Sequence, residues 1–500
     1  MYKRQAVLVT VALCAASLAG AQVINPIPEP IVNQGLRVEI TTVARLPDSR
    51  AKHPPDQDVD PQAWARVSFV RDIADGRRFA NDSRGGLYLI DEDGEPALYV
   101  DVSEAFPHGV YNGLESGFIG FEFHPEFAAN GLFYTVHGEL ADGNPAAPDF
   151  IPPGFGPADV TYHNVITEWR ANDPAANEFE GARRELLRVA HVVDRFFHPY
   201  GYVGFNPTAQ PGDEDYGLLY TSGSDLGFSN GGGPNAINPG QLQRLDSLVG
   251  AILRIDPRSP AESGGTRGVG DYTIPPSNPW AADGDPGTLG EIYAHGFRNA
   301  HRFSWDHSDG TMFAAEIGNM QIEEINVVHA GGNYGWFQRE GIFDNGINLP
   351  GGQMEQVHAL PDDILAGRTE DPFIYPVAMY DHDEGIAITN GFAYRGSVAG
   401  LQGKFVFGDI QRGRVFAADT SEMKAADDGV PETVADIEEV QLYVRNADGS
   451  TRDVTLWELI EEAMGRTVVR ADLQISEGRD GELFVTSRQD GFIRMLGAAE

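Results

Sequence analysis

A short pattern recurs six times along this 500-residue chain: a glycine, one or two further residues, and then an aromatic-rich run of strand-forming residues. Turn-forming residues usually precede it, as in Asp309-Gly310 and Asp480-Gly481, which favour tight hairpins. The copies lie about 45 to 95 residues apart and begin at Gly86, Gly131, Gly217, Gly310, Gly403 and Gly481. This recurrence predicts an all-β, six-bladed β-propeller with long inter-strand loops, each copy forming an inner strand of one blade. The alternative is a β-sandwich, which rarely needs so many equivalent strands.

The chain divides into three predicted parts. Residues 1–21 are typical of a secretory signal peptide, because Lys3 and Arg4 precede an apolar run and small residues lead to a cleavage point after Ala21. Residues 22–60 are rich in proline and are expected to precede the blades, and residues 61–500 to form the propeller. Within the propeller, 419–466 is an acidic insertion in which Leu456–Met464 has helical spacing. The sequence therefore predicts a periplasmic or secreted protein without a membrane span.

Charge and cysteine content narrow the possible partners. The chain has 74 acidic and 36 basic residues, which give a net charge of −38 at pH 7. Such a surface repels nucleic acid and anionic membranes and suits a neutral or cationic small ligand or bound divalent cations. Cys14, the single cysteine, lies in the predicted signal peptide. The mature chain would then have no disulfide, no thiolate metal site and no covalently bound haem.

Two loop ends carry a candidate catalytic pair. His198 stands just before a predicted strand at 202–205, and Asp225 stands at the end of the next one. Successive strands of one blade would bring these loop ends together. An aspartate that accepts a hydrogen bond from one imidazole nitrogen fixes the tautomer and raises the basicity of the other nitrogen. The alternative is that His198, which precedes Pro199, is a packing or capping residue.

A second group of polar residues lies between Glu291 and Trp336. It contains Arg298-Asn299, three acids at 316, 323 and 324, and a glycine-rich turn that ends at Trp336. Turn residues, aromatic strand formers and spaced acids in so short a span indicate a sheet whose loops carry a polar site. The alternative for Arg298 is a structural salt bridge.

These residues, together with the block Glu115–Phe127, resemble the soluble pyrroloquinoline quinone (PQQ)-dependent sugar dehydrogenases, a family that includes the aldose sugar dehydrogenases and the glucose/sorbosone dehydrogenase group. The resemblance extends from about residue 65 to Arg494. It implies oxidation of an aldose sugar at the anomeric carbon to a lactone, with PQQ and calcium as cofactors and a separate electron acceptor. His198 would be the general base, with Asp225 orienting it and Arg298 polarising the quinone. The cofactor contacts implied by the resemblance are Glu115, His198, Arg298, Asn299, Gln411 and Arg470.

The resemblance also implies two calcium sites. One would use backbone carbonyls of Gly318 and Asn319 and bridge the cofactor to the protein; the other would use Glu324 and the carbonyl of Tyr334, with Asp344 as a further ligand. Glu323 and Glu324 would point to opposite faces of a strand, so only one of them would face the metal. The chain departs from the family pattern at Ile317, Asn319, Gln411 and Ala471.

Two other functions remain open from the sequence. A calcium-stabilised propeller without catalytic activity could bind a glycan or a protein partner, as the similarity of the family to hedgehog-interacting propellers suggests. A calcium-dependent lactonase or phosphotriesterase would instead need several carboxylates around a central metal. The deciding observation is whether His198, Asp225 and Arg298 converge on one pocket.

Overall fold

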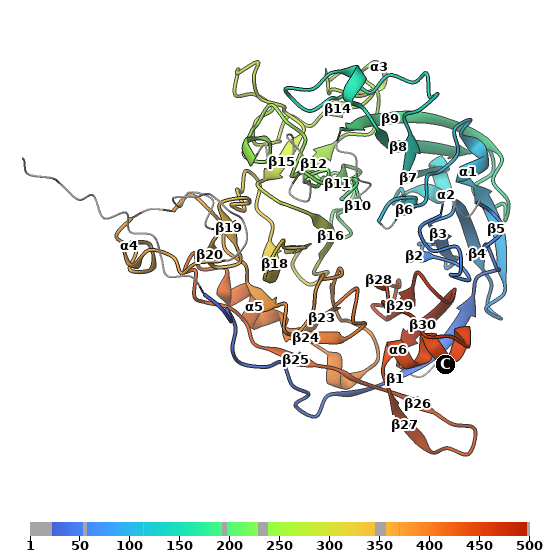
Figure 1. The fold of residues 1–500 in the computed structure, drawn as a ribbon. Helices are drawn as coiled ribbons and strands as arrows, with labels where there is room; N and C mark the ends of the chain where they lie inside the picture. Colours follow the sequence, from blue (N-terminus) through green and yellow to red (C-terminus); the bar gives the residue numbers. More distant parts are fainter. Residues whose placement is uncertain are drawn as a thin grey trace, which may run out of the picture.

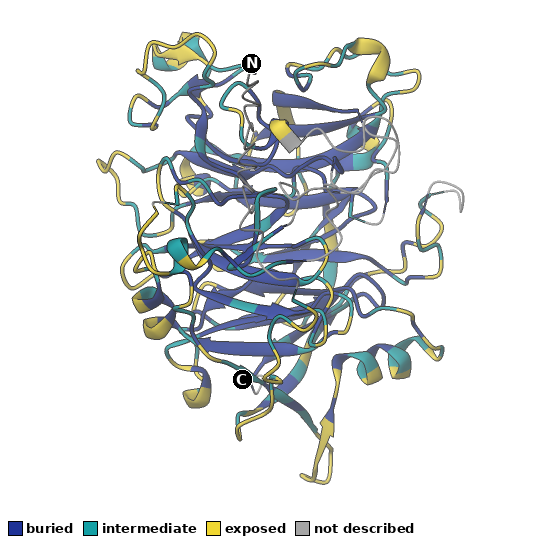
Figure 2. Cartoon of the chain, turned by 60° about the vertical axis from the view of Figure 1, so that its left-hand side comes forward, coloured by how far each residue is buried: buried dark blue, intermediate teal, exposed yellow. Residues whose placement is uncertain are grey.

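Six sheets are arranged around a common axis as the blades of a propeller (Figure 1). The computed structural model describes residues 23–53, 58–113, 115–192, 198–228, 239–345, 357–369 and 371–497. The predicted signal peptide and its cleavage point lie outside these ranges. The strands are largely buried, and the connecting loops carry most of the exposed surface (Figure 2). The predicted six-bladed β-propeller is thereby confirmed.

Each of the first five blades is a four-stranded antiparallel sheet, and its strands follow the order of the chain. The first two blades consist of β2 (Val67–Asp72), β3 (Arg78–Asp82), β4 (Gly86–Ile90) and β5 (Pro96–Asp101), then β6 (Phe118–Phe123), β7 (Leu132–Leu140), β8 (Tyr162–Ala171) and β9 (Gly181–His191). The third and fourth consist of β10 (Tyr202–Phe205), β11 (Leu219–Ser222), β12 (Ala251–Ile255) and β15 (Ile292–His295), then β16 (Ala300–Trp305), β17 (Met312–Glu316), β18 (Ile322–Val327) and β21 (Ala378–Asp381). The fifth consists of β22 (Phe392–Ala393), β23 (Lys404–Gly408), β24 (Val415–Asp419) and β25 (Ile437–Glu439).

The sixth blade combines strands from distant parts of the chain. Its order is β27-β26-β1-β30-β29-β28, where β1 is Arg37–Arg45, β26 is Gln441–Arg445, β27 is Thr451–Val454, β28 is Leu473–Glu477, β29 is Leu483–Ser487 and β30 is Phe492–Leu496. β1 pairs antiparallel with β30, where Ile40 lies opposite Leu496, and parallel with β26, where Val38 lies opposite Leu442. The segment that we expected to precede the blades therefore contributes a central strand to the last one and closes the ring.

The remaining elements are short. Two small hairpins are formed by β13 (Thr266–Arg267) with β14 (Thr273–Ile274) and by β19 (Arg339–Glu340) with β20 (Phe343–Asp344). The helices are α1 (Val102–Ala105), α2 (Phe127–Asn130), α3 (Pro260–Ser263), α4 (Asp362–Leu365), α5 (Thr420–Ala426) and α6 (Leu456–Met464), with 3-10 turns at Pro157–Asp159, Pro239–Gln241 and Ala399–Leu401. Residues 419–466 thus hold α5 as well as α6, the one helix expected there. Among the described residues, no helix has the length and apolar character needed to cross a membrane.

The recurring glycine–aromatic pattern lies on an inner strand of each blade, as expected, and not on the strand nearest the axis. It lies on the second strand of five blades (β7, β11, β17, β23 and β29) and on the third strand, β4, of the first. The reason is the turn that precedes it. Gly310, with φ of 78°, lies in the turn between β16 and β17, and Gly481, also with φ of 78°, lies between β28 and β29. A positive φ favours glycine, so the pattern marks the turn into the second strand.

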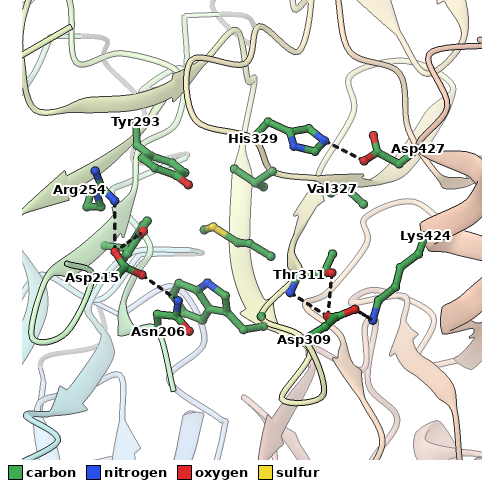
Figure 3. Close-up of a pocket in the computed structure, with 15 residues that line it drawn as sticks. Asn206, Asp215, Arg254, Tyr293, Asp309, Thr311, Val327, His329, Lys424 and Asp427 are labelled. Atoms are coloured by element: carbon green, nitrogen blue, oxygen red, sulfur yellow. Dashed lines mark hydrogen bonds and ion pairs between the residues drawn. The ribbon is translucent and has the colours of Figure 1, made fainter. Parts of the chain in front are cut away.

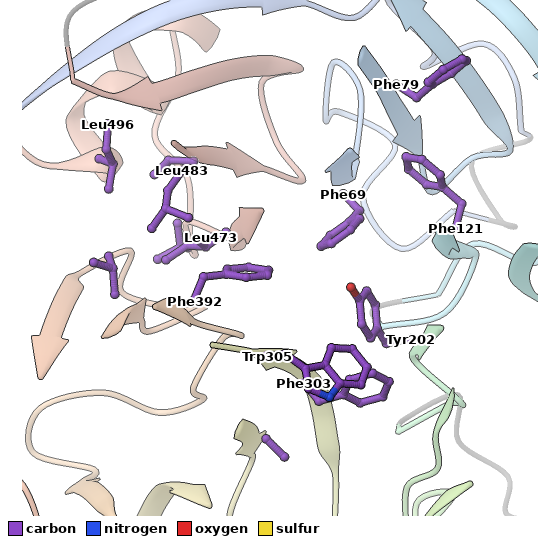
Figure 4. Close-up of a cluster of buried hydrophobic side chains, with 14 of the residues drawn as sticks. Phe69, Phe79, Phe121, Tyr202, Phe303, Trp305, Phe392, Leu473, Leu483 and Leu496 are labelled. Carbon is purple, nitrogen blue, oxygen red and sulfur yellow. The ribbon is translucent and has the colours of Figure 1, made fainter. Parts of the chain in front are cut away.

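Aromatic side chains from the innermost strands pack across the axis (Figure 4). The ring of Phe69 on β2 lies 5.3 Å from that of Tyr202 on β10, which in turn lies 4.9 Å from Phe303 on β16, both pairs edge-to-face. The first and third blades are not neighbours in the ring, so the Phe69–Tyr202 contact lies inside the second blade, toward the axis. Such pairs contribute about 0.5–1.5 kcal/mol each beyond their burial. The guanidinium of Arg302 lies over both rings, 4.7 Å from the centroid of Phe69 and 5.9 Å from that of Tyr202.

Candidate active site

A cavity of about 230 Å3 lies at one end of the propeller, where loops of five blades converge. The loops that supply it either precede the first strand of a blade or follow the second. Antiparallel neighbours begin and end at the same edge of a sheet, so these loops all reach the same end of the ring. Six of the lining residues bear on the chemistry: Glu115, His198, Arg298, Gln411, Arg470 and Arg488.

His198 and Asp225 form a buried pair on one wall of this cavity. His198 precedes β10 and Asp225 follows β11, and these two strands pair with each other. The Nδ1 atom of His198 lies 2.6 Å from Oδ1 of Asp225, which also accepts a hydrogen bond of 2.8 Å from the amide of Gly227. An ionised Asp225 keeps the proton on Nδ1, which makes Nε2 the basic nitrogen of the ring.

The backbone at His198 is held in an unusual conformation. Its φ is 54°, in the left-handed region that few non-glycine residues adopt. Its amide donates a 2.7 Å hydrogen bond to Oε2 of Glu115, and its carbonyl accepts one from the hydroxyl of Ser224. Glu115 therefore reaches the cavity as predicted from the resemblance, and its clearest role is to fix the backbone of the candidate base. Strained backbone of this kind persists only where the surroundings determine it.

Arg298 also lines the cavity and contacts the loop that follows β17. Its Nη1 donates to the carbonyl oxygens of Ile317, at 3.0 Å, and of Gly318. Its Nη2 donates to Oδ1 of Asn319 at 3.2 Å. Two of the predicted calcium ligands, the loop residues Gly318 and Asn319, thus lie on the cavity and contact a guanidinium group.

Asn299, a predicted cofactor contact, is buried and is not among the residues that line the cavity. Its backbone forms an isolated bridge with Ser224. The backbone amides of Asn299 and Arg298 donate to the same oxygen of Glu316, at 3.0 and 2.5 Å. Asn299 thus lies directly beside the cavity-lining Arg298 and shares its carboxylate partner.

Arg470, Gln411 and Arg488 also line the cavity. Arg470 precedes β28 and pairs with Asp472, while Gln411 follows β23. No second arginine stands beside Arg470 in the sequence, where the flanking residues are Val469 and Ala471. Arg488 supplies that guanidinium from the next strand end, immediately after β29. The signal was available, since Arg488 follows the last copy of the recurring strand pattern.

Positive charge accumulates beneath the cavity. The Nη2 atoms of Arg302 and Arg488 both contact Ser68, at 2.9 Å from its carbonyl oxygen and its hydroxyl respectively. Burial and the neighbouring Arg488 lower the pKa of Arg302 to about 9, and burial and Arg66 lower the pKa of Arg488 to about 10. Buried guanidinium groups that repel each other are stabilised by an anion. In a chain of net charge −38, this concentration of cations indicates an anionic ligand.

His301 and His382 also line the cavity, and neither was among the predicted site residues. Burial, Arg302 and Arg488 hold the pKa of His301 well below its usual value, so this ring is neutral. His382 contacts Glu323, with Nε2 and Oε1 3.0 Å apart, and Glu323 is fully buried. These rings add polar groups to a wall that otherwise contains Ile317, Ile386 and Ile410.

The carboxylates of the second predicted calcium site have protein partners. Glu324 accepts hydrogen bonds from the amide of Gly341 at 2.7 Å and from Asn326 at 3.1 Å, while Asp344 pairs with Arg339 at 3.3 Å. The ring of Tyr334 stacks on Phe297 at 4.2 Å. As strand geometry requires, Glu323 and Glu324 have partners on different sides of β18. Within the described ranges, no group of three or more His, Cys, Asp or Glu side chains is arranged to hold a metal ion.

A larger hollow of about 520 Å3 opens at the other end of the third and fourth blades (Figure 3). Its charges form pairs across its rim: Asp215 with Arg254 at 3.2 Å, Asp309 with Lys424 at 2.7 Å, and His329 with Asp427 at 2.8 Å. By volume alone, this hollow would be the better candidate for the functional site. The smaller cavity is the better candidate, because its cations outnumber its acids and a buried His–Asp pair lies on its wall.

Comparison with known proteins agrees with this geometry. The family model described as Glucose / Sorbosone dehydrogenase matches residues 64–493. The chain belongs to this family. Family membership and the shared fold support an oxidoreductase.

Individual relatives of this glucose/sorbosone dehydrogenase family member are distant. The HIPL1 protein of Arabidopsis thaliana is 28% identical over 377 residues, which cover 68% of this chain and 50% of the relative. The chain thus spans about half the length of the curated relatives that it matches most extensively.

Solved structures show the same fold at low identity. The soluble aldose sugar dehydrogenase from Escherichia coli in its apo form has a TM-score of 0.56 and 16% identity, covering 92% of this chain and 100% of the other. The PQQ-bound form of aldose sugar dehydrogenase from Streptomyces coelicolor has a TM-score of 0.51 and 18% identity, covering 92% and 98%.

Proposed function

We propose that this chain is an exported, PQQ-dependent oxidoreductase that oxidises an aldose sugar at the anomeric carbon to a lactone and passes the electrons to a separate acceptor. The observation that supports it most is the convergence of the His198–Asp225 pair and Arg298 on one cationic cavity. Export is proposed from the signal-like segment at residues 1–21.

The residues present fit PQQ, a flat aromatic molecule with three carboxylates and an ortho-quinone. Three guanidinium groups line the cavity, those of Arg298, Arg470 and Arg488, and each brings a positive charge that attracts a carboxylate or a carbonyl oxygen. Ile317 and Ile410 offer apolar surface for the ring system. When bound, the cofactor would supply the acceptor for two electrons from the sugar. The positive charge beneath the cavity would stabilise the charge that develops on reduction.

His198 would act as the general base. With the proton on Nδ1 directed at Asp225, the Nε2 atom would take the proton of the anomeric hydroxyl as the hydrogen on the same carbon leaves as hydride. Asp225 would stabilise the imidazolium that results. Because the pair is buried, with His198 3% and Asp225 0% exposed, bulk water would be kept from competing for the base.

Reconstitution of the purified protein with PQQ tests the proposal. Binding is followed by absorbance, and turnover by reduction of an artificial dye with a panel of aldoses. We expect His198→Ala to abolish dye reduction while PQQ binding persists. His329→Ala is the matched control, since this histidine lines the larger hollow at the other end, and it should leave turnover unchanged. PQQ binding without turnover of any sugar would favour the non-catalytic binder, and failure to bind PQQ would refute the proposal.

A further inference from the structure

We infer that Arg298 takes the place of a bridging calcium ion in this cavity, so that cofactor binding does not require calcium. This inference rests on the proposed binding of PQQ. It concerns the loop Ile317–Asn319, in which the family resemblance assigned the backbone carbonyls of Gly318 and Asn319 to calcium.

Three of the four oxygens of this loop already accept hydrogen bonds from Arg298. The carbonyls of Ile317 and Gly318 both accept from Nη1, and the side-chain oxygen of Asn319 accepts from Nη2. The loop also lies close to neighbouring backbone, since a Cβ at Gly318 would lie 1.7 Å from the carbonyl oxygen of Ile322. Such a close backbone approach leaves no room for a side chain at this position.

The oxygen supply is also too small for calcium. Calcium takes six to eight oxygen ligands at 2.3–2.6 Å. The loop offers four oxygens, three of which accept from Arg298, and the side chain of Ile317 contributes none. Two carboxylates contact the loop or Arg298, but they do so from behind and do not line the cavity. Oε1 of Glu340 accepts from the amides of residues 319–322 at 2.8–3.1 Å, and Oε1 of Glu316 accepts from those of Arg298 and Asn299.

Charge and packing keep the guanidinium in position. Arg298 is only 4% exposed, and its Cζ lies 5.8 Å from the ring centroid of Trp336. A calcium ion at the loop would approach this guanidinium and would share the cavity with Arg470 and Arg488. A divalent cation is repelled by such neighbours, whereas an anionic cofactor is attracted by them. Arg298 can therefore present positive charge to the cofactor directly.

The first experiment is an absorbance titration of wild-type protein with PQQ in EDTA and in excess calcium chloride. We expect dissociation constants that agree within about threefold. Binding that appears only with calcium, or that calcium strengthens tenfold or more, would overturn the inference and leave the proposed function standing. No PQQ binding under either condition would refute the proposed function itself.

The second experiment needs no PQQ. Calcium alone is titrated calorimetrically into cofactor-free wild type, Arg298→Met and Arg470→Met. Removing Arg298 should free the loop oxygens and tighten calcium binding at least tenfold relative to both other proteins. Arg470→Met is the matched control, because it removes the same charge from the same cavity without touching the loop. Equal calcium binding by all three proteins would overturn the inference.

Discussion

The amide nitrogen of Asp225 donates a 2.6 Å hydrogen bond to the carbonyl oxygen of Arg298. Asp225 follows β11 in the third blade and Arg298 precedes β16 in the fourth, so this bond joins two blades at the cavity. The residue that orients the candidate base is thereby tied to the residue that carries the nearest guanidinium. A relative shift of these blades would disturb proton transfer and ligand binding together, which is why variants need both a binding and a turnover measurement.

Replacing Asp225 by Asn separates these two functions. The amide of Asn can donate to Nδ1 of His198, which would place the imidazole proton on Nε2 and remove the base. We expect kcat with an active aldose to fall by roughly 10²–10⁴-fold, the usual contribution of general-base catalysis. The dissociation constant for PQQ should change by less than threefold. Asp309→Asn, in the larger hollow, is the control; a kcat for Asp225→Asn equal to wild type would count against the assigned role.

Arg470→Gln should weaken PQQ binding and leave the fold intact. Arg470 precedes β28 and its side chain is 21% exposed, so its loss does not open a core cavity. A charged hydrogen bond contributes about 1.5–3 kcal/mol, which corresponds to a roughly 10- to 100-fold increase in dissociation constant. Arg479→Gln removes one charge from a side chain that is 52% exposed and is absent from the cavity lining. Equal affinities for the two variants would show that Arg470 does not contact the cofactor.

Ile40→Ala tests how strongly the closure of the ring contributes to stability. Ile40 is 3% exposed on β1, opposite Leu496 on β30. Truncating a buried isoleucine costs about 2–5 kcal/mol of unfolding free energy. Thr42→Ala, at an exposed position of the same strand, should cost less than about 0.5 kcal/mol. The two variants are compared by chemical and thermal unfolding, and similar midpoints would mean that β1 is dispensable for stability.

Glu324→Gln should flatten the dependence of stability on pH. Burial raises the pKa of Glu324 from 4.5 to about 7. Between these values the folded protein binds a proton that the unfolded chain has released, so stability falls as pH rises through this window and stays lower above it. The loss of unfolding free energy is about 3 kcal/mol, at 1.36 kcal/mol per pKa unit. The unfolding free energy, measured by thermal unfolding in EDTA, should differ less between pH 5 and pH 8 for the variant than for wild type. Equal differences for the two proteins would contradict the raised pKa of Glu324.

Local sequence patterns were sufficient for features that depend on adjacent strands. His198 and Asp225 flank β10 and β11, and a turn-then-strand repeat predicts that such loop ends meet. The six recurring strands likewise predict six blades, and helical spacing predicts α6 at Leu456–Met464.

Local sequence patterns could not predict features that depend on contacts between distant parts of the chain. β1 pairs with a strand some 450 residues away, and nothing in its own pattern distinguishes it from an isolated strand. Side-chain directions could not be predicted either. Arg298 donates to a loop in the same blade, and residue order alone could not show that its guanidinium contacts the Gly318 carbonyl assigned to calcium.

The sheet that joins β1 to β30 has a consequence for biosynthesis. β30, near residue 490, must be synthesised before β1, near residue 40, can pair with it. Arg470 and Arg488 belong to the same late-synthesised part of the chain. Until then, the nascent chain lacks both the β1–β30 pairing that closes the ring and two of the arginines that line the cavity. The proposed cofactor could therefore meet its complete cavity only after residues 470–488 have been synthesised.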